Sequence, residues 1–176
     1  MLNILKKRVK TMNSFNHLNQ QGEAHMTKIS HKPTTRRQAS AQAIVHFNHD
    51  TFKRLLEGVH PKGDIFAAAR IAGIVAAKKT SELIPLCHPL ALSHITIDIS
   101  PQLLDQTLLI CSHCETMGQT GVEMEALTAV SVASLTIYDM CKSIQKDIWI
   151  GSVHLLEKSG GVSGQFKTNS KREVVL

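Results

Sequence analysis

The stretch VEMEALTAVSVASLTIYDMC, residues 122–141, belongs to the longest segment of this sequence that contains neither glycine nor proline. Apolar and small side chains recur in it every three or four residues, as at Leu127, Val130 and Ser134. This is the spacing that brings side chains to one face of an α-helix. Because few charged residues interrupt the stretch, it predicts a long, largely buried helix against which the rest of the fold is packed.

The segments on both sides of this helix show the alternation that is typical of β-strands. From Gln38 to Phe47, small or apolar residues such as Ala39 and Val45 occupy every second position. Alternate side chains of a strand point to opposite faces of a sheet, so this period of two predicts one buried face. The same criteria predict strands at 38–47, 92–99, 106–115 and 147–156. The second and third should form a hairpin around residues 101–105.

Two more helices are expected between the first strand and the hairpin. Asp50 is placed to cap a short one, and Gly58 to end it in the left-handed conformation. Asp64 is placed to cap a second helix that continues to about Lys79. The elements then follow the order of a ferredoxin-like β-α-β-β-α-β sandwich with an extra short helix, which is an α+β fold. This fold hosts many chemistries, so the function must be argued from individual residues.

Length and composition fit one globular domain. The chain has 176 residues, of which 43% are apolar, and this is enough to form a core without disulfides. Its four cysteines are unevenly spaced, and we expect them to be reduced. No apolar run is long enough to span a membrane, and residues 1–11 have the wrong order of charges for a secretory signal. We therefore expect a cytoplasmic protein with no membrane partner.

The net charge of +6 is concentrated at the N-terminus. Four basic residues and no acidic residue lie within residues 1–11, so the remainder of the chain is close to neutral. A basic arm is one possible nucleic-acid contact, but without interleaved aromatic residues the pattern favours a solvated extension and no nucleic-acid partner. The predicted organisation is a basic extension at 1–11, a single catalytic domain at 12–157 and a glycine-rich tail at 158–176.

Asp139 and Lys142 stand three residues apart near the end of the long helix, where their side chains are neighbours. By itself such a pair can be only a surface ion pair, but because the helix is so apolar we expect it to be partly buried, and partial burial can lower the pKa of the lysine. Glu125 precedes Asp139 by fourteen residues, or about 21 Å along a helix axis. One small-molecule site therefore uses both ends only if it is completed across a subunit interface.

Two cysteine-containing motifs also suggest chemistry. In IPLCHP, residues 84–89, two prolines restrict a loop that presents His88, although a loop histidine by itself is more often structural. In CSHC, residues 111–114, the Cys-x-x-Cys spacing suggests a zinc site or a redox dithiol. A strand would send Cys111 and Cys114 to opposite faces, and a second cysteine pair is missing, so we expect no metal there.

Three stretches of the sequence together resemble the cyclic pyranopterin monophosphate synthase family. They are KGDIFAAARIAGIVAAKKTSELIPLCHPL at 62–90, TGVEMEALTAVSVASLTIYDMCK at 120–142 and KSGGVSGQF at 158–166. The similarity also includes GEAHM at 22–26. The family has a ferredoxin-like α+β fold and forms a homohexamer, a trimer of dimers, with active sites at subunit interfaces. The resemblance therefore implies the same fold and the same assembly for this chain.

The resemblance also implies a reaction and a set of site residues. Family members are lyases of molybdenum cofactor (molybdopterin) biosynthesis that convert 3′,8-cyclo-7,8-dihydro-GTP into cyclic pyranopterin monophosphate and pyrophosphate, without a redox cofactor. By motif, Asp139, Lys142 and Lys62 correspond to catalytic residues. The residues implied to bind substrate are Leu86, Cys87, His88, Met124, Glu125, Arg37 and Lys158.

Overall fold

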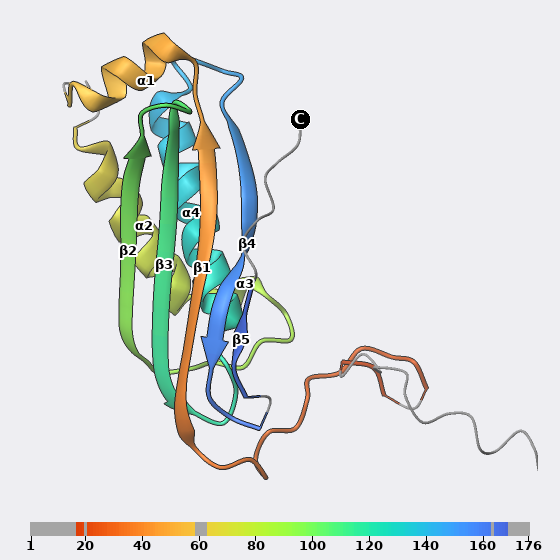
Figure 1. Ribbon diagram of the computed structural model, residues 1–176. Helices are drawn as coiled ribbons and strands as arrows, with labels where there is room; N and C mark the ends of the chain where they lie inside the picture. The colour runs from red at the N-terminus through yellow and green to blue at the C-terminus, as the bar shows by residue number, and fades with distance from the viewer. Residues whose placement is uncertain (1–16, 20, 59–62, 163, 169–176) are drawn as a thin grey trace, which may run out of the picture.

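A computed structural model of the chain describes residues 17–19, 21–58, 63–162 and 164–168 and shows one antiparallel sheet with helices on one face (Figure 1). The elements are β1 (Thr35–His46), α1 (His49–Leu56), α2 (Ile65–Lys78), α3 (Thr80–Leu83), β2 (Leu92–Gln102), β3 (Thr107–Gly118), α4 (Glu123–Cys141), β4 (Trp149–Ser159) and β5 (Phe166–Lys167).

The strands are arranged in the order β2-β3-β1-β4-β5. Every neighbouring pair is antiparallel, and β1 lies in the middle. The first four strands therefore have the connectivity of a ferredoxin-like sandwich, which confirms the predicted fold class. The two-residue strand β5 was not predicted, because two residues are too few to show an alternation.

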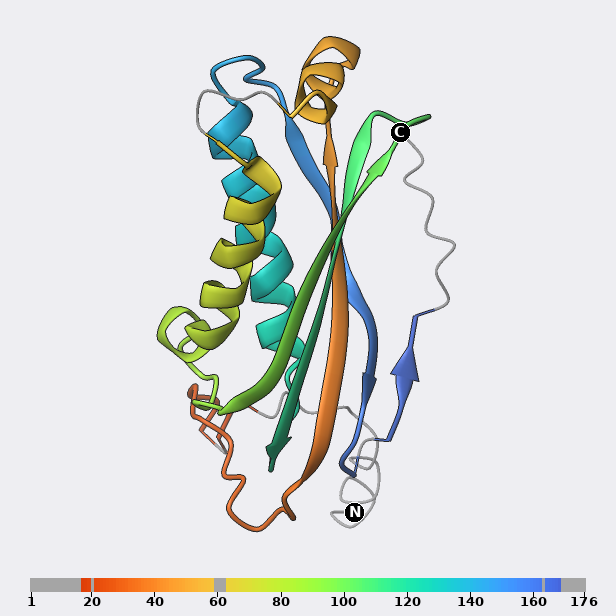
Figure 2. The same cartoon turned by 90° about the vertical axis from the view of Figure 1, so that its left-hand side faces the viewer.

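Helices α2 and α4 cover one face of the sheet, as the view along its edge shows (Figure 2). The side chains of β1 at Ala39, Ala41, Ala43 and Val45 have at most 1% of their surface exposed and lie beneath α4. Three of these four are alanines, so the helix can approach the strand closely. The predicted alternation of this strand is confirmed.

The two helices also approach each other closely, at Gly73 of α2. A Cβ built there would lie 2.8 Å from the backbone oxygen of Ala129 in α4 and would overlap the side chain of Ile97 in β2. Both contacts are closer than van der Waals contact. Glycine at this position therefore fixes the spacing of α2, α4 and β2.

The helix caps confirm one prediction and correct another. Asp64 caps α2, since its Oδ1 accepts a hydrogen bond from the backbone N–H of Ala67 at 2.9 Å. The cap of α1 is Asn48, which accepts from the N–H of Thr51 at 2.8 Å, and not Asp50. Asp50 lies inside the first turn, where a carboxylate interacts favourably with the helix dipole instead. Gly58 has a φ of 71°, the left-handed conformation that we expected.

The hairpin strands are longer than predicted. Pro101 was expected in the connection but lies in β2, paired with Leu108 of β3. Proline is tolerated there because β2 is an edge strand, in which an N–H that faces outward has no partner to lose. Gln106, with a φ of 49°, completes the turn. The short helix α3 was also not expected as a separate element.

No helix in the described ranges is long and apolar enough to cross a bilayer. The basic segment 1–11 lies outside the described residues. The division of the chain into extension, domain and tail stays a prediction.

Candidate active site

A cavity of about 250 Å³ opens beside the N-terminal end of α4. The connection between α3 and β2 contributes Leu86, Cys87 and His88, and α4 contributes Met124 and Glu125. Five of the residues predicted to bind substrate, from two segments far apart in the sequence, therefore line one cavity. The N-terminal segment closes another wall with His17, Thr27, Ile29 and Lys32.

The loop that carries Cys87 and His88 is held in place from both sides. The N–H of Cys87 donates to the carbonyl of Ile84 at 3.0 Å, which closes a turn at the end of α3. The hydroxyl of Thr116 in β3 donates to the carbonyl of Ala91 at 2.6 Å. The side chains of this loop are consequently positioned by the sheet and not only by the two prolines.

Glu125 is a buried carboxyl group, with 4% of its surface exposed. Burial raises its pKa to about 7, and the negative charge of Glu123 adds to the increase, although a hydrogen bond from its own backbone N–H opposes it. The carboxyl group therefore gains and loses a proton near neutral pH. Such a group can serve as a general acid or base.

Glu123 also lines the cavity, although the sequence did not suggest a role for it. Its Oε1 accepts a hydrogen bond from the ammonium group of Lys158 at 2.7 Å. Lys158 comes from the end of β4, so this ion pair joins the end of that strand to the beginning of α4. The fold brings these two residues together. In the sequence each belongs to a different motif, and nothing in either motif indicates that the two side chains form an ion pair.

Arg37 lies beside this region but is not among the residues that line the cavity. Its side chain is 7% exposed, and it donates to the carbonyls of Gly118 at 3.2 Å and Gln119 at 3.4 Å. A Cβ on Gly161 would overlap Nη1 of this guanidinium group. Arg37 thus holds the loop between β3 and α4 against the turn that follows β4.

The cysteine pair of CSHC does not form a site. Cys114 is fully buried on the face covered by the helices, while Cys111 is partly exposed on the other face. Burial, together with the charge of Glu125, raises the pKa of Cys114 to about 12. The two thiols diverge as the strand alternation predicted. In the described part of the chain no group of three or more histidine, cysteine or acidic side chains has a metal-binding arrangement.

Asp139 and Lys142 lie at the opposite end of α4, about 21 Å from Glu125 along the helix axis. They form an ion pair of 2.6 Å, and their side chains are 60% and 52% exposed. The hydrogen bond to Asp139 raises the pKa of Lys142. The expected burial and lowered pKa are therefore wrong for this chain by itself, because both side chains lie on the exposed side of the last turn of α4, whose other side is buried at Cys141.

Lys62 lies outside the described residues. Its described neighbours Gly58 and Gly63 border a groove of about 600 Å³ between α1 and α2. Figure 1 places the C-terminal end of α1, the N-terminal end of α2 and the C-terminal end of α4 at one end of the molecule. The loop after α3 lies at the other end. The sequence-predicted residues of the described chain thus form two groups, one at each end of α4.

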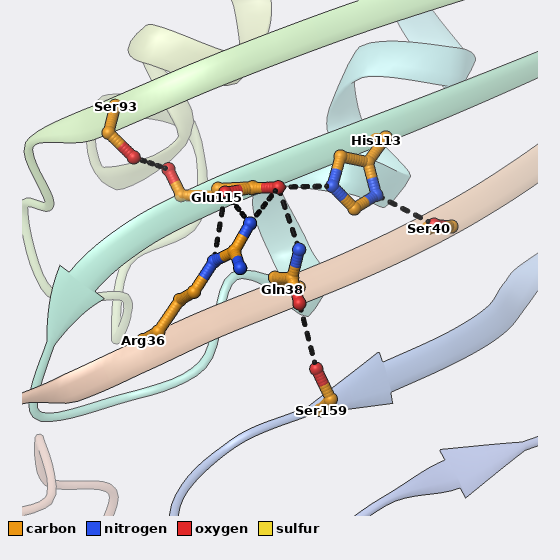
Figure 3. A network of polar contacts seen from close by, with 7 residues as sticks. All are labelled: Arg36, Gln38, Ser40, Ser93, His113, Glu115 and Ser159. Atoms are coloured by element: carbon orange, nitrogen blue, oxygen red, sulfur yellow. Dashed lines mark hydrogen bonds and ion pairs between the residues drawn. The ribbon is translucent and has the colours of Figure 1, made fainter.

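The outer face of the sheet carries a separate polar network (Figure 3). Glu115 accepts hydrogen bonds from Arg36 and Gln38 and lies 3.0 Å from Nε2 of His113, whose Nδ1 is 3.0 Å from the hydroxyl of Ser40. The bonds to His113, Arg36 and Gln38 lower the pKa of Glu115 to about 2. The network joins β1 to β3 on the face that the helices leave uncovered.

Most residues of the cavity and the group of Asp139 and Lys142 belong to a region that matches a known family. The model of the MoaC family matches residues 26–161, which is most of the chain. The chain belongs to the MoaC family. Membership implies a role in the biosynthesis of the molybdenum cofactor. The matched range includes the cavity residues of α4 and of the loop after α3, together with Arg37, Asp139 and Lys142.

The contact of Arg37 with Gly161 predicts unequal effects of two similar substitutions. Gly161 and Gly164 have φ values of 75° and 66°, so alanine strains the backbone at both. Only at position 161 would the methyl group displace the guanidinium, because Gly164 has open space around it. We expect Gly161→Ala to lose at least about 1 kcal/mol more unfolding free energy in urea than Gly164→Ala, the cost of unpaired buried groups. Equal losses would contradict the role of Arg37.

The raised pKa of Glu125 predicts a pH-dependent stability. The folded state keeps the proton up to about pH 7, while the unfolded state loses it near 4.5. The free energy of unfolding contributed by this group is therefore fully present below pH 4.5 and is lost as pH rises to 7, by at most about 1.4 kcal/mol per pH unit.

The matched variant for this test is Glu125→Gln, which cannot ionise. Relative to the parent, its stability in urea should increase between pH 4.5 and 7 and then stay constant. A difference that is flat across this range would show that Glu125 ionises normally in the folded protein.

Proposed function

We propose that this MoaC-family protein is a cyclic pyranopterin monophosphate synthase. It is a lyase that converts 3′,8-cyclo-7,8-dihydro-GTP into cyclic pyranopterin monophosphate and pyrophosphate, without a redox cofactor, in the cytoplasm. The observation that carries the proposal is the cavity at the N-terminal end of α4, which unites the LCH and ME motifs. Its lining is partly apolar, at Leu86 and Met124, and partly titratable, at His88 and Glu125.

The rearrangement of the purine-derived ring into a pterin requires protons to be delivered and removed at several nitrogen and oxygen atoms. Glu125 is suited to this work because its pKa of about 7 allows both protonation states at neutral pH. In the proposed arrangement His88 binds substrate beside it and does not act as a nucleophile.

Formation of the cyclic phosphate is a substitution at the α-phosphorus. A hydroxyl derived from the sugar attacks this phosphorus and loses its proton to a base. The bond from the α-phosphorus to the bridging oxygen breaks, and pyrophosphate leaves with the electron pair. Cations that neutralise the growing negative charge accelerate this step. Lys62 and Lys142 are proposed for this role and for proton transfer, with the charge and position of Lys142 set by Asp139.

The separation of the two groups supports a site shared between subunits. The groups at the ends of α4 are about 21 Å apart, too far for one small molecule to contact both in one chain. In the proposed homohexamer, a trimer of dimers, each site takes the cavity from one subunit and the group of Asp139 and Lys142 from another. Contact with a neighbour would also cover the exposed ion pair.

Substitution of Lys142 tests the reaction and the second group together. Lys142→Ala should reduce pyrophosphate release from 3′,8-cyclo-7,8-dihydro-GTP by about 10² to 10⁴-fold, the usual contribution of a general acid or base. Lys146→Ala, a nearby lysine with no proposed role, is the control. Assembly size measured by sedimentation should be unchanged in both. A parent that folds but does not turn over this substrate would refute the proposed reaction.

Mixing two inactive variants tests whether sites are shared. Glu125→Gln and Lys142→Ala each damage one group, and subunits of the two variants, co-expressed in equal amounts, should assemble into mixed oligomers. If each site draws its two groups from different subunits, about a quarter of the sites carry both intact residues, and activity should recover to that fraction. If both groups served one site within a chain, the mixture would remain inactive.

A further inference from the structure

The N-terminal segment forms one wall of the cavity. None of the sequence motifs predicted that the residues of this wall belong to the site. The side chains that face the cavity there include Thr27, Ile29 and Lys32, whereas Lys28 is exposed. The segment is fastened at Lys32, since the side-chain amide of Gln119 donates to its carbonyl at 2.9 Å. The N–H of Lys32 donates in turn to the carbonyl of Ile29 at 2.8 Å. The backbone at Lys32 is thus tied to the loop that leads into α4.

Two other cations near the cavity, Lys158 and Arg37, already have hydrogen-bond partners. The ammonium of Lys158 binds Glu123 at 2.7 Å, and the guanidinium of Arg37 donates to two backbone carbonyls. Among the described residues that line the cavity, Lys32 is the one lysine or arginine. No ion pair joins it to another residue that the structure describes.

The carboxyl groups of the cavity leave this charge largely uncompensated. Glu123 is neutralised by Lys158, and Glu125 carries a proton much of the time near neutral pH. A partly buried lysine that forms no ion pair with another described residue attracts an anion from solution. A phosphate chain is the anion that lysine binds well, as a compact point charge with three donors.

We propose that Lys32 is a binding residue for the phosphate chain of the substrate, at the wall of the cavity formed by the N-terminal segment. The inference rests on the proposed function, which supplies a substrate with a triphosphate. The pterin-forming rings then lie toward Leu86 and Met124, and the phosphates toward Lys32. This assigns to Lys32 a charge-neutralising role for which Arg37 and Lys158, both already paired, are less available.

Binding of inorganic tripolyphosphate to the assembled protein, measured by isothermal titration calorimetry, tests the site without turnover. Lys32→Gln should weaken this binding by about tenfold or more, the usual effect of losing a hydrogen bond to a charged group. Lys32→Arg should largely retain it. The matched control is Lys28→Gln, which removes the same charge from the same segment and should change the affinity less than about twofold.

Turnover adds a second measurement. With 3′,8-cyclo-7,8-dihydro-GTP, Lys32→Gln should raise KM by a similar factor and leave kcat within a few-fold, because the contact is made in both ground and transition states. Unchanged tripolyphosphate affinity, or equal losses for Lys28→Gln and Lys32→Gln, would overturn the proposal. A parent that binds tripolyphosphate through Lys32 but does not turn over would refute the proposed reaction and leave this site standing.

Discussion

The close packing of α4 against the sheet is the constraint on which the rest of the structure depends. Alanines in β1 and in α4 leave little side-chain volume between these two elements, and Gly73 lets α2 approach α4 and β2 closely. Interiors packed at this density do not adjust easily to added atoms. Helix α4 is therefore held rigidly against the sheet, and the positions of its two ends are fixed relative to the strands.

That rigidity explains why the chain carries two separate groups of site residues. At its N-terminal end α4 places Glu125 and Met124 against the loop of Cys87 and His88. At its C-terminal end it presents Asp139 and Lys142 to solvent. A helix held straight by the sheet cannot fold back to unite them, so the distance between the groups is a property of the fold and not of one loop conformation.

The electrostatics of the two ends differ for the same structural reason. Glu125 is enclosed by the sheet, the loop after α3 and the N-terminal segment, and burial makes its proton labile near pH 7. Lys142 is solvated and hydrogen-bonded to a carboxylate, and this hydrogen bond raises its pKa, so it remains protonated. One end can thus both accept and donate a proton near neutral pH, and the other supplies positive charge and a proton to donate.

The sequence by itself determined the order and type of the main elements, the ferredoxin-like plan and the motifs that the MoaC family shares. It could do so because periodicity and capping act over a few residues, as at Asp64. The prediction from sequence was wrong where two nearby residues, Asn48 and Asp50, could both cap the same helix. It also missed β5, because a strand of two residues is too short to show an alternating pattern.

Tertiary structure alone decided which side chains meet. The pairing of Glu123 with Lys158, the burial of Glu125 and the place of Lys32 in the cavity wall all depend on segments far apart in the chain. The exposure of Lys142 likewise depends on which elements pack against the end of α4. Burial and charge pairing depend on such distant neighbours. Local sequence patterns carry no information about them, which is why only the fold could show them.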